Sequence, residues 1–363
     1  MCTRRQLLVR GAAFALTLGR GKAVFSALDV PVQQKEEAGK LIAPATQKTI
    51  EAGLKFLADE QHADGSFGKG AYNGNVGVTS LAGLAFFAAG HQPDDSPRGK
   101  ILSKAVDFIL TQENRSGVHP GFLHNPDASP HGPMYSHGFA TLLLAYLRGK
   151  GKDKKQAAKR DEALERAVKL IVSSQNKDGG WRYMPTSRDA DSTVTSGQMM
   201  ALAVARQSRL TVPEKTINAG VSYIKRCFMP ATGGFAYMLQ GGGKPMYSRT
   251  AAAVATLQAM GIHKGEEVEK GLDFLNKNQP ARAPRPDMHY YYGLYYAARV
   301  MHRRSGAAGK DWFTAISKEL RGQQQGNGSW NDVIDSHYAT AMACLVLLMP
   351  EGRLMVQSEQ KKD

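Results

Sequence analysis

The stretch Arg166-Ala-Val-Lys-Leu-Ile-Val-Ser-Ser-Gln-Asn-Lys-Asp-Gly-Gly-Trp181 joins an amphipathic segment to a glutamine, a glycine turn and an aromatic residue. Its first half follows a five-position pattern, in which a small residue is followed by an aliphatic residue, any residue, an aromatic residue or Leu, and a second aliphatic residue. This pattern recurs about every 50–60 residues. A regular period of this size predicts a repeat architecture. The copies begin at Gly53, Ala105, Ala167, Gly220 and Gly271, with a weaker sixth near Ala315-Ile316.

The second half, Gln-x-x-x-Gly-x-aromatic, recurs at residues 61–67, 175–181 and 324–330. An Asp-Gly or Asn-Gly pair supplies a turn after a helix, because these residues accept the left-handed backbone conformation. The glutamine amide is expected to hydrogen-bond with open backbone groups at a helix end of a neighbouring repeat. We assign the aromatic side chains Phe67, Trp181 and Trp330 to packing over the turns.

Each turn is followed by a second apolar segment rich in small residues. Because these segments are apolar nearly all round, we expect helices that are buried on both sides. The alternating pattern of strands is missing from the sequence. The sequence therefore predicts an all-α fold of six helical hairpins in two concentric layers, with the second helices as the inner wall. The inner segments begin at Val78, Tyr135, Thr193, Tyr247, His289 and His337.

Composition excludes several classes of protein. The 363 residues contain only Cys2, Cys227 and Cys344, too few for a disulfide framework. No apolar run is long enough to span a bilayer. The net charge of +15 is diffuse apart from a run between Arg148 and Arg160, which we interpret as a solvated loop leading into a helix. We expect no nucleic-acid partner, and leave open a peripheral contact with an anionic membrane or cell-envelope polymer.

The N-terminal residues 1–27 match a twin-arginine export signal, because Arg4-Arg5 precede a short apolar stretch at 11–18. We therefore predict export to the periplasm or cell envelope, the alternative being an ordinary basic N-terminus. The predicted boundaries are residues 1–27 for the signal, 28–44 for a linker, 45–350 for the repeat domain and 351–363 for a polar C-terminal tail.

Through these motifs the chain resembles the prenyltransferase/squalene-oxidase repeat family. Residues 166–181 look like the glutamine–tryptophan (QW) repeat of triterpene cyclases, and residues 135–141 and 337–341 resemble inner helices of single-toroid, exported bacterial members. The resemblance covers about residues 45–350 and implies an (α/α)6 toroid. The family includes cyclases, protein prenyltransferases and complement-like thioester domains, so the fold does not fix the chemistry. The thioester sequence is absent, and the chain is too short for the second α-barrel domain of full triterpene cyclases.

The acidic stretch Asp189-Ala-Asp191-Ser192-Thr193 precedes the third inner segment. It resembles the Asp-x-Asp-Asp motif with which squalene–hopene-type cyclases protonate an alkene. The resemblance implies Asp191 as the acid and Asp189 as its neighbour, and the acid would have to be a carboxyl kept protonated in a site freed from water. Ser192 replaces the fourth carboxyl, so the motif is incomplete. The alternative is that Asp191 or Ser192 caps the following helix.

A second group of residues resembles the zinc site of protein prenyltransferases. Asp287, His289 and His337 fall in comparable repeats and would leave an open fourth position on zinc. His289 stands where that family has Cys, so zinc remains only a possible cofactor. The alternative is that these histidines are simply hydrogen-bonded at helix ends.

Other candidates lie near the starts of inner segments. His137 is a third catalytic candidate, with an interior histidine bonded to a backbone carbonyl as the alternative. Tyr135, Tyr247, Tyr290 and Tyr292 are candidates to line an apolar ligand pocket with polar tips.

The starts of the inner helices should converge at one end of the ring, because every second helix of a hairpin toroid begins there. The resemblance leaves three functions open. The first is a terpene-cyclase-like enzyme acting on an isoprenoid or another long apolar chain by acid protonation. The second is an exported module that binds a lipid, peptide or glycan without changing it, and a zinc-dependent prenyltransferase-like site is a third alternative.

Overall fold

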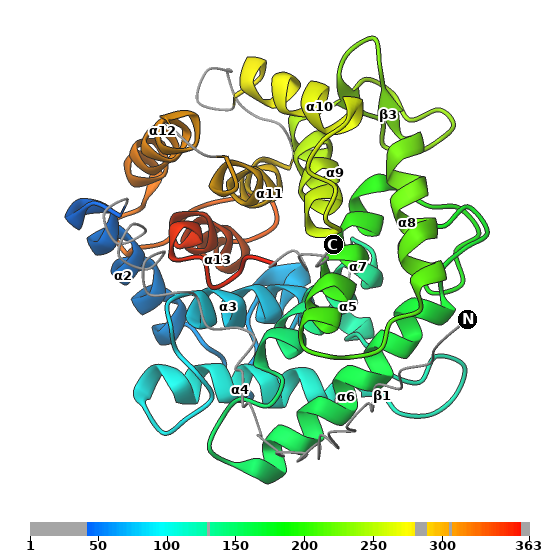
Figure 1. The fold of residues 1–363 in the computed structure, drawn as a ribbon. Helices are drawn as coiled ribbons and strands as arrows, with labels where there is room; N and C mark the ends of the chain where they lie inside the picture. The colour runs from blue at the N-terminus through cyan, green and yellow to red at the C-terminus, as the bar shows by residue number, and fades with distance from the viewer. Residues whose placement is uncertain (1–41, 129–130, 280–288, 305–306, 357–363) are drawn as a thin grey trace, which may run out of the picture.

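The computed structural model describes residues 42–128, 131–279, 289–304 and 307–356. Twelve helices form the body of this part of the chain (Figure 1). They are α2 (Pro44–Asp59), α3 (Val76–Ala88), α4 (Pro97–Thr111), α5 (Pro133–Leu147), α6 (Lys154–Ser173), α7 (Ser192–Gln207), α8 (Glu214–Arg226), α9 (Tyr247–Ala259), α10 (Glu266–Lys277), α11 (Tyr290–His302), α12 (Ala307–Gln323) and α13 (Ser336–Leu347).

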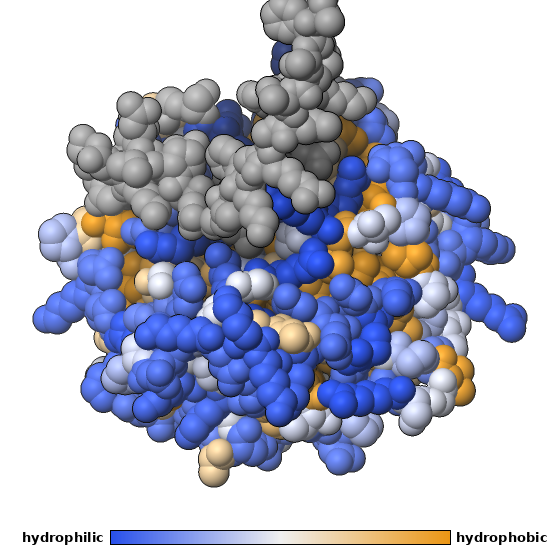
Figure 2. Space-filling model, turned by 60° about the horizontal axis from the view of Figure 1, so that its bottom comes forward, coloured by the Kyte–Doolittle hydropathy of each residue, from blue (hydrophilic) through white to orange (hydrophobic). Residues whose placement is uncertain are grey.

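The helices alternate between two concentric rings, as predicted (Figure 1). The odd-numbered helices α3 to α13 form the inner ring, in which each helix contacts the next, and α13 contacts α3 to close the circle. All thirteen residues of α3 are buried, as expected for a helix with neighbours on every side. The outer helices α6 and α10 bury only one face, and Figure 2 shows a largely hydrophilic surface with smaller hydrophobic patches. The chain is an all-α, (α/α)6 toroid of six hairpins.

The predicted turn chemistry holds each repeat to the next. The Gln175 side-chain amide donates to the carbonyl oxygens of Gly179, at 2.8 Å, and of Thr216 at the start of α8, at 3.0 Å. Gln61 and Gln324 make the equivalent pairs of bonds in their own turns. Gly179 has φ +91° and a Cβ there would lie 2.4 Å from the Ala219 carbonyl oxygen. Glycine is therefore required where the turn meets the next outer helix.

A second recurring hydrogen bond joins a turn to the inner helix of the same repeat. The backbone N–H of Trp181 donates to Thr195 Oγ1 at 3.0 Å, and that of Trp330 donates to Thr340 Oγ1 at 3.0 Å. Phe67 and Phe235 make the same bond with Thr79 and Thr250. Four repeats thus use a threonine one turn into the inner helix to hold the turn.

Two details differ from the sequence prediction. The described residues include two short antiparallel hairpins in the connections, β1 (Glu113–Asn114) with β2 (Phe122–Leu123) and β3 (Phe228–Met229) with β4 (Gly234–Phe235). The packed domain also extends beyond the predicted boundary at residue 350.

The C-terminal segment covers the end of the ring where the inner helices finish. Leu354 and Val356 are buried, and the Leu354 carbonyl oxygen accepts from the Arg299 guanidinium at 2.7 Å and from the Tyr146 hydroxyl. Arg353 donates to the carbonyl oxygen of Ala88 at the end of α3, at 2.8 Å. Residues 351–356 are therefore part of the toroid and not of a polar tail. None of the described helices has the length and apolar character needed to cross a membrane.

Candidate functional site

A cavity of about 330 Å³ lies at the end of the ring where the inner helices begin. Every inner helix contributes wall residues from its first turn or its N-cap. These include Val78 of α3, Tyr135 of α5, Thr193 of α7, Arg249 of α9, Tyr292 of α11 and Tyr338 of α13. The expected convergence of inner-helix starts is thus what forms the cavity.

Tyrosine side chains dominate the wall of the cavity. Tyr135 and Tyr292 were candidates from sequence and they do line it, whereas Tyr72, Tyr183, Tyr237 and Tyr338 were not recognised. The apolar side chains of Val78, Leu81, Phe139 and Ile334 complete the lining. Phenol rings present an electron-rich face that attracts a cation, and their hydroxyls provide polar tips in an otherwise apolar site.

Asp191 is fully buried at the N-cap of α7, directly behind this wall. Its Oδ1 accepts hydrogen bonds from the backbone N–H groups of Thr193, at 2.9 Å, and Val194, at 2.7 Å, and from Thr193 Oγ1, at 2.7 Å. Its Oδ2 accepts from the Tyr237 hydroxyl at 3.2 Å and lies 4.0 Å from Arg182 Nε. Oδ1 therefore caps α7, as the capping alternative predicted, while Oδ2 faces a residue of the cavity wall.

The surroundings of Asp191 shift its pKa in opposite directions. Burial raises the pKa of this carboxyl above its ordinary value, while the hydrogen bonds from Thr193 and Val194 and the nearby Arg182 lower it. Burial has the largest effect, because the charged form loses its hydration. The net shift is upward, in the direction that an acid catalyst requires.

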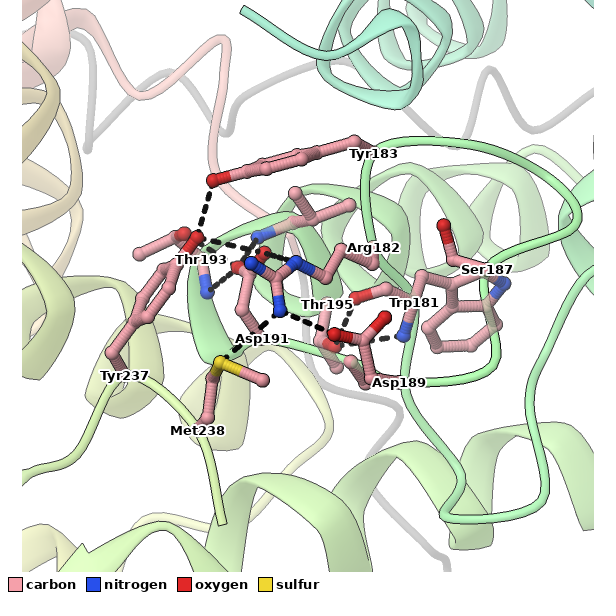
Figure 3. Close-up of polar contacts among 12 residues, drawn as sticks. Trp181, Arg182, Tyr183, Ser187, Asp189, Asp191, Thr193, Thr195, Tyr237 and Met238 are labelled. Carbon is pink, nitrogen blue, oxygen red and sulfur yellow. Dashed lines mark hydrogen bonds and ion pairs between the residues drawn. The ribbon is translucent and has the colours of Figure 1, made fainter. Parts of the chain in front are cut away.

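Asp189 has a different place from Asp191. Its side chain is exposed and pairs with Arg182, with 2.5 Å between Asp189 Oδ2 and Arg182 Nη1 (Figure 3). The Arg182 guanidinium lies 4.9 Å from the ring centre of Tyr183 and 5.7 Å from that of Tyr237. Asp189 therefore acts on Asp191 only through Arg182, and it does not line the cavity.

His137 faces the outer layer and not the cavity. Its Nδ1 accepts from the backbone N–H of Leu123 at 3.2 Å, and its Nε2 lies 3.2 Å from the carbonyl oxygen of Ala167 in α6. Leu123 occupies the position in its turn that Phe67 and Trp181 occupy in theirs. His137 therefore accepts the backbone hydrogen bond that a threonine accepts in four other repeats. Burial lowers its pKa to about 4, which keeps the ring neutral. The structure thus supports the interior-histidine alternative for His137.

Two of the four predicted pocket tyrosines point elsewhere. The Tyr290 hydroxyl donates to Glu319 of α12 at 2.6 Å, and the Tyr247 hydroxyl accepts from the Trp312 indole at 3.3 Å. Both contacts join an inner helix to α12, so Tyr290 and Tyr247 are corrected from ligand-binding to packing residues. Their side chains leave the helix on the side facing outward, and a run of adjacent tyrosines cannot place every ring inside.

The proposed zinc ligands do not share one environment. His289 lines the cavity. His337 does not line the cavity and is fully buried against the turn at Gly68, whose backbone N–H donates to His337 Nδ1 at 2.9 Å. Burial lowers its pKa to about 4. Asp287 lies outside the described residues. Across the described ranges no group of three His, Cys, Asp or Glu residues could hold a metal ion.

The cavity residues that the sequence did not predict lie mainly in the loops after the turns. Tyr183 and Tyr237 each follow a turn aromatic by two residues, after Trp181 and Phe235 respectively. That shared spacing is a signal that links them. Arg182 carried no signal of its own, because its role depends on two loops that meet only in the folded protein.

A closed α/α toroid with a tyrosine-lined cavity at the inner-helix starts is the class of protein that these features define. A family model described as the prenyltransferase alpha-alpha toroid domain matches residues 78–339. The chain therefore belongs to the prenyltransferase α/α-toroid family. No curated protein sequence matches it.

Solved structures share the fold at low sequence identity. A variant of the type II terpene cyclase MstE from Scytonema, in complex with merosterolic acid A as product, is 14% identical, with a TM-score of 0.60 over 87% of this chain and 99% of that chain. A second MstE variant, in complex with geranylgeranyl dihydroxybenzoate as substrate, has 14% identity and a TM-score of 0.56 over 87% and 98% of the two chains. The GH76 alpha-mannanase BT2949 of Bacteroides thetaiotaomicron reaches a TM-score of 0.61 at 9% identity, covering 86% and 98%. Cyclase and mannanase share this architecture, so the likeness establishes the fold alone.

Proposed function

We propose that the protein binds an isoprenoid or a similar long apolar molecule in the cavity at the inner-helix starts. The observation that carries this proposal is the cavity itself, about 330 Å³ in volume and walled by tyrosines and apolar side chains. Its volume is within the range of small-molecule sites, and such sites are mostly apolar with a few polar groups that fix orientation. The MstE neighbours, which bind geranylgeranyl dihydroxybenzoate and merosterolic acid A, support an isoprenoid ligand.

Blocking the cavity should remove binding. Val78 lies on its wall, and the larger side chain of Val78→Trp should occupy space that the ligand needs. Burying an apolar group of side-chain size contributes roughly 1.5–3 kcal/mol. Losing that burial should weaken binding of the C20 alcohol geranylgeraniol by at least about 10-fold. Titration calorimetry measures the affinity. Val118→Trp adds the same side chain at a position 84% exposed on the β1–β2 turn, and should bind like the wild type. Equal affinities in all three proteins, or no binding by the wild type, would contradict the proposal.

A specific observation favours catalysis as a second candidate. Asp191 combines a raised pKa with a direct hydrogen bond to Tyr237, a residue of the cavity wall. A buried, protonated carboxyl beside an aromatic cavity can protonate an alkene, and the aromatic rings can stabilise the resulting cation. The proposed reaction is therefore acid-catalysed cyclisation of the bound chain.

The non-catalytic alternative also rests on an observation. Asp335 caps α13 as Asp191 caps α7, with its Oδ1 accepting from the backbone N–H of Tyr338 at 2.7 Å. Capping by a carboxylate is thus a feature of more than one repeat. The two residues differ at Oδ2, because that of Asp335 accepts from the backbone N–H of Lys69 at 3.3 Å, away from the cavity wall.

We further propose export through the twin-arginine signal at residues 1–27, as the sequence suggests. Replacing Arg4 and Arg5 together by lysine should trap the unprocessed precursor in the cytoplasm, because this export route reads the arginine pair itself. Fractionation and immunoblotting of cells that make the double variant measure the result. Lysine substitution at Arg10 and Arg20, which keeps the charge and spares the pair, is the control. Normal export of the Arg4/Arg5 variant would contradict the assignment.

A further inference from the structure

The carboxyl of Asp191 has no direct exposure to the cavity. Its side chain is fully buried, and the residues of the cavity wall beside it are Thr193 and Tyr237. A ligand in the cavity therefore meets the hydroxyl groups of these residues before it meets the carboxyl. If Asp191 supplies a proton, one of its neighbours has to pass that proton on.

The hydrogen bonds decide on which oxygen the proton resides. Oδ1 accepts from two backbone N–H groups, of Thr193 and Val194, which cannot reverse their direction, and from Thr193 Oγ1. Oδ2 faces the Tyr237 hydroxyl, which can act as donor or acceptor. The proton of a neutral Asp191 thus lies on Oδ2 and is donated to the oxygen of Tyr237.

Tyr237 is in turn joined to a second hydroxyl. Its oxygen is hydrogen-bonded to the hydroxyl of Tyr183, an exposed residue on the cavity wall (Figure 3). When Asp191 is ionised, the Tyr183 hydroxyl donates to the Tyr237 oxygen, and the Tyr237 hydroxyl donates to Asp191 Oδ2. When Asp191 is protonated, Oδ2 donates to the Tyr237 oxygen, and the Tyr237 proton can point either to the Tyr183 oxygen or to a ligand in the cavity.

Ser192, the residue that departs from the acidic motif, holds Tyr237 in this position. Its backbone N–H donates to the Tyr237 carbonyl oxygen at 2.8 Å, and its hydroxyl donates to the Ala236 carbonyl oxygen at 2.9 Å. An ionised carboxylate at position 192 could only accept hydrogen bonds, and it would repel the Ala236 carbonyl. The replacement of Asp by Ser therefore suits the loop that carries Tyr237. The Arg249 guanidinium, 5.2 Å from the Tyr237 ring centre, packs on the same ring.

We propose that Tyr237 is a further catalytic residue, whose hydroxyl delivers the proton of Asp191 to the ligand, with Ser192 as its positioning residue. This inference rests on the proposed acid-catalysed cyclisation. In one step the π electron pair of the alkene takes the Tyr237 proton to form a C–H bond, leaving a carbocation. The Asp191 proton moves to the Tyr237 oxygen, and Oδ2 keeps the electron pair as a carboxylate. The cation ends by losing a proton to water, and water reprotonates Asp191 through Tyr183 and Tyr237, so the net reaction is an isomerisation.

Tyr237→Phe separates this route from direct protonation by Asp191. Losing a donor to Oδ2 should raise the pKa of Asp191 by about one to two units, which the infrared band of the protonated carboxyl measures as a function of pH. Asp191→Asn identifies that band by removing it. Direct protonation would then be preserved or accelerated, because more Asp191 is protonated, whereas our proposal expects turnover of geranylgeraniol to fall at least about 100-fold with binding unchanged. Tyr338→Phe, which alters another wall tyrosine, is the control and should leave the Asp191 band unshifted.

The outcomes separate this inference from the proposed function. An unshifted Asp191 band in Tyr237→Phe, or retained turnover, overturns the role of Tyr237 while ligand binding stands. A wild type that binds geranylgeraniol but never changes it overturns the delivery step. A wild type that does not bind it overturns the proposed function, and the infrared titration still tests the coupling of Asp191 to Tyr237. A shifted band together with lost turnover and retained binding supports the inference.

Discussion

Asp191→Asn is expected to abolish turnover of an isoprenoid substrate while the protein stays folded. Asparagine is as good an N-cap as aspartate, so its side-chain oxygen can keep the bonds from Thr193 and Val194 that Oδ1 now accepts. The amide cannot act as an acid, and general acid catalysis contributes about 10²–10⁴-fold to a rate. Product analysis by mass spectrometry, with thermal unfolding as the test of folding, measures both effects.

The matched control is Asp335→Asn. This substitution makes the same change at the same helix position of another repeat, where Oδ2 bonds with Lys69 and not with the cavity wall. It should leave turnover near the wild-type rate. If both variants lose turnover equally, Asp191 acts as a structural cap, and only the binding function remains.

The pH dependence of the wild type belongs to the same prediction. An acid catalyst must be protonated, and burial raises the pKa of Asp191 above its ordinary value. Turnover should therefore be highest below this raised pKa and fall as the pH rises through it. Activity that grows steadily with pH in the acidic range would argue against Asp191 as the proton source.

Trp181→Ala is expected to lower the free energy of unfolding by about 3–5 kcal/mol, the usual cost of removing a buried Trp. Trp181 is almost fully buried between α6 and α7, and its indole N–H donates to the Ile171 carbonyl oxygen at 2.8 Å. The substitution would leave a cavity and remove the indole hydrogen bond to the Ile171 carbonyl oxygen, which keeps only the bond from the Ser174 hydroxyl at 3.2 Å. Equilibrium unfolding in urea measures the loss.

Two comparisons test the structural reason. Trp330→Ala should cost a similar amount, because Trp330 makes the same indole bond with the Leu320 carbonyl oxygen at 2.8 Å. Val118→Ala, at a highly exposed position, should change the free energy of unfolding by less than about 0.5 kcal/mol. A cost below about 1 kcal/mol at Trp181 would show that the turn aromatics are not part of the shared core.

The sequence by itself determined the architecture. The repeated pattern that includes Gln175, Gly179 and Trp181 predicts hairpins of fixed form, because its interactions are short in sequence or made with the adjoining repeat. Gln175, for example, bonds with Gly179 in its own turn and with Thr216 in the next outer helix. Such contacts recur with the period of the chain, so the toroid and the convergence of the inner-helix starts followed from the pattern. The identity of Asp191 as a residue of interest also came from sequence, through a resemblance.

Only the tertiary structure decided which side chains face the cavity. An inner helix is buried on every side, so its sequence has no polar face to mark the inward direction. His137 and Tyr290 therefore looked like cavity residues, although one holds a turn and the other bonds with α12. The partners of Asp191 Oδ2 were equally hidden, because Tyr237 lies 46 residues away in the next repeat and reaches the carboxyl through its loop. Rotation about a helix axis and the meeting of distant loops are set by packing in three dimensions, and the repeated sequence pattern does not specify either of them.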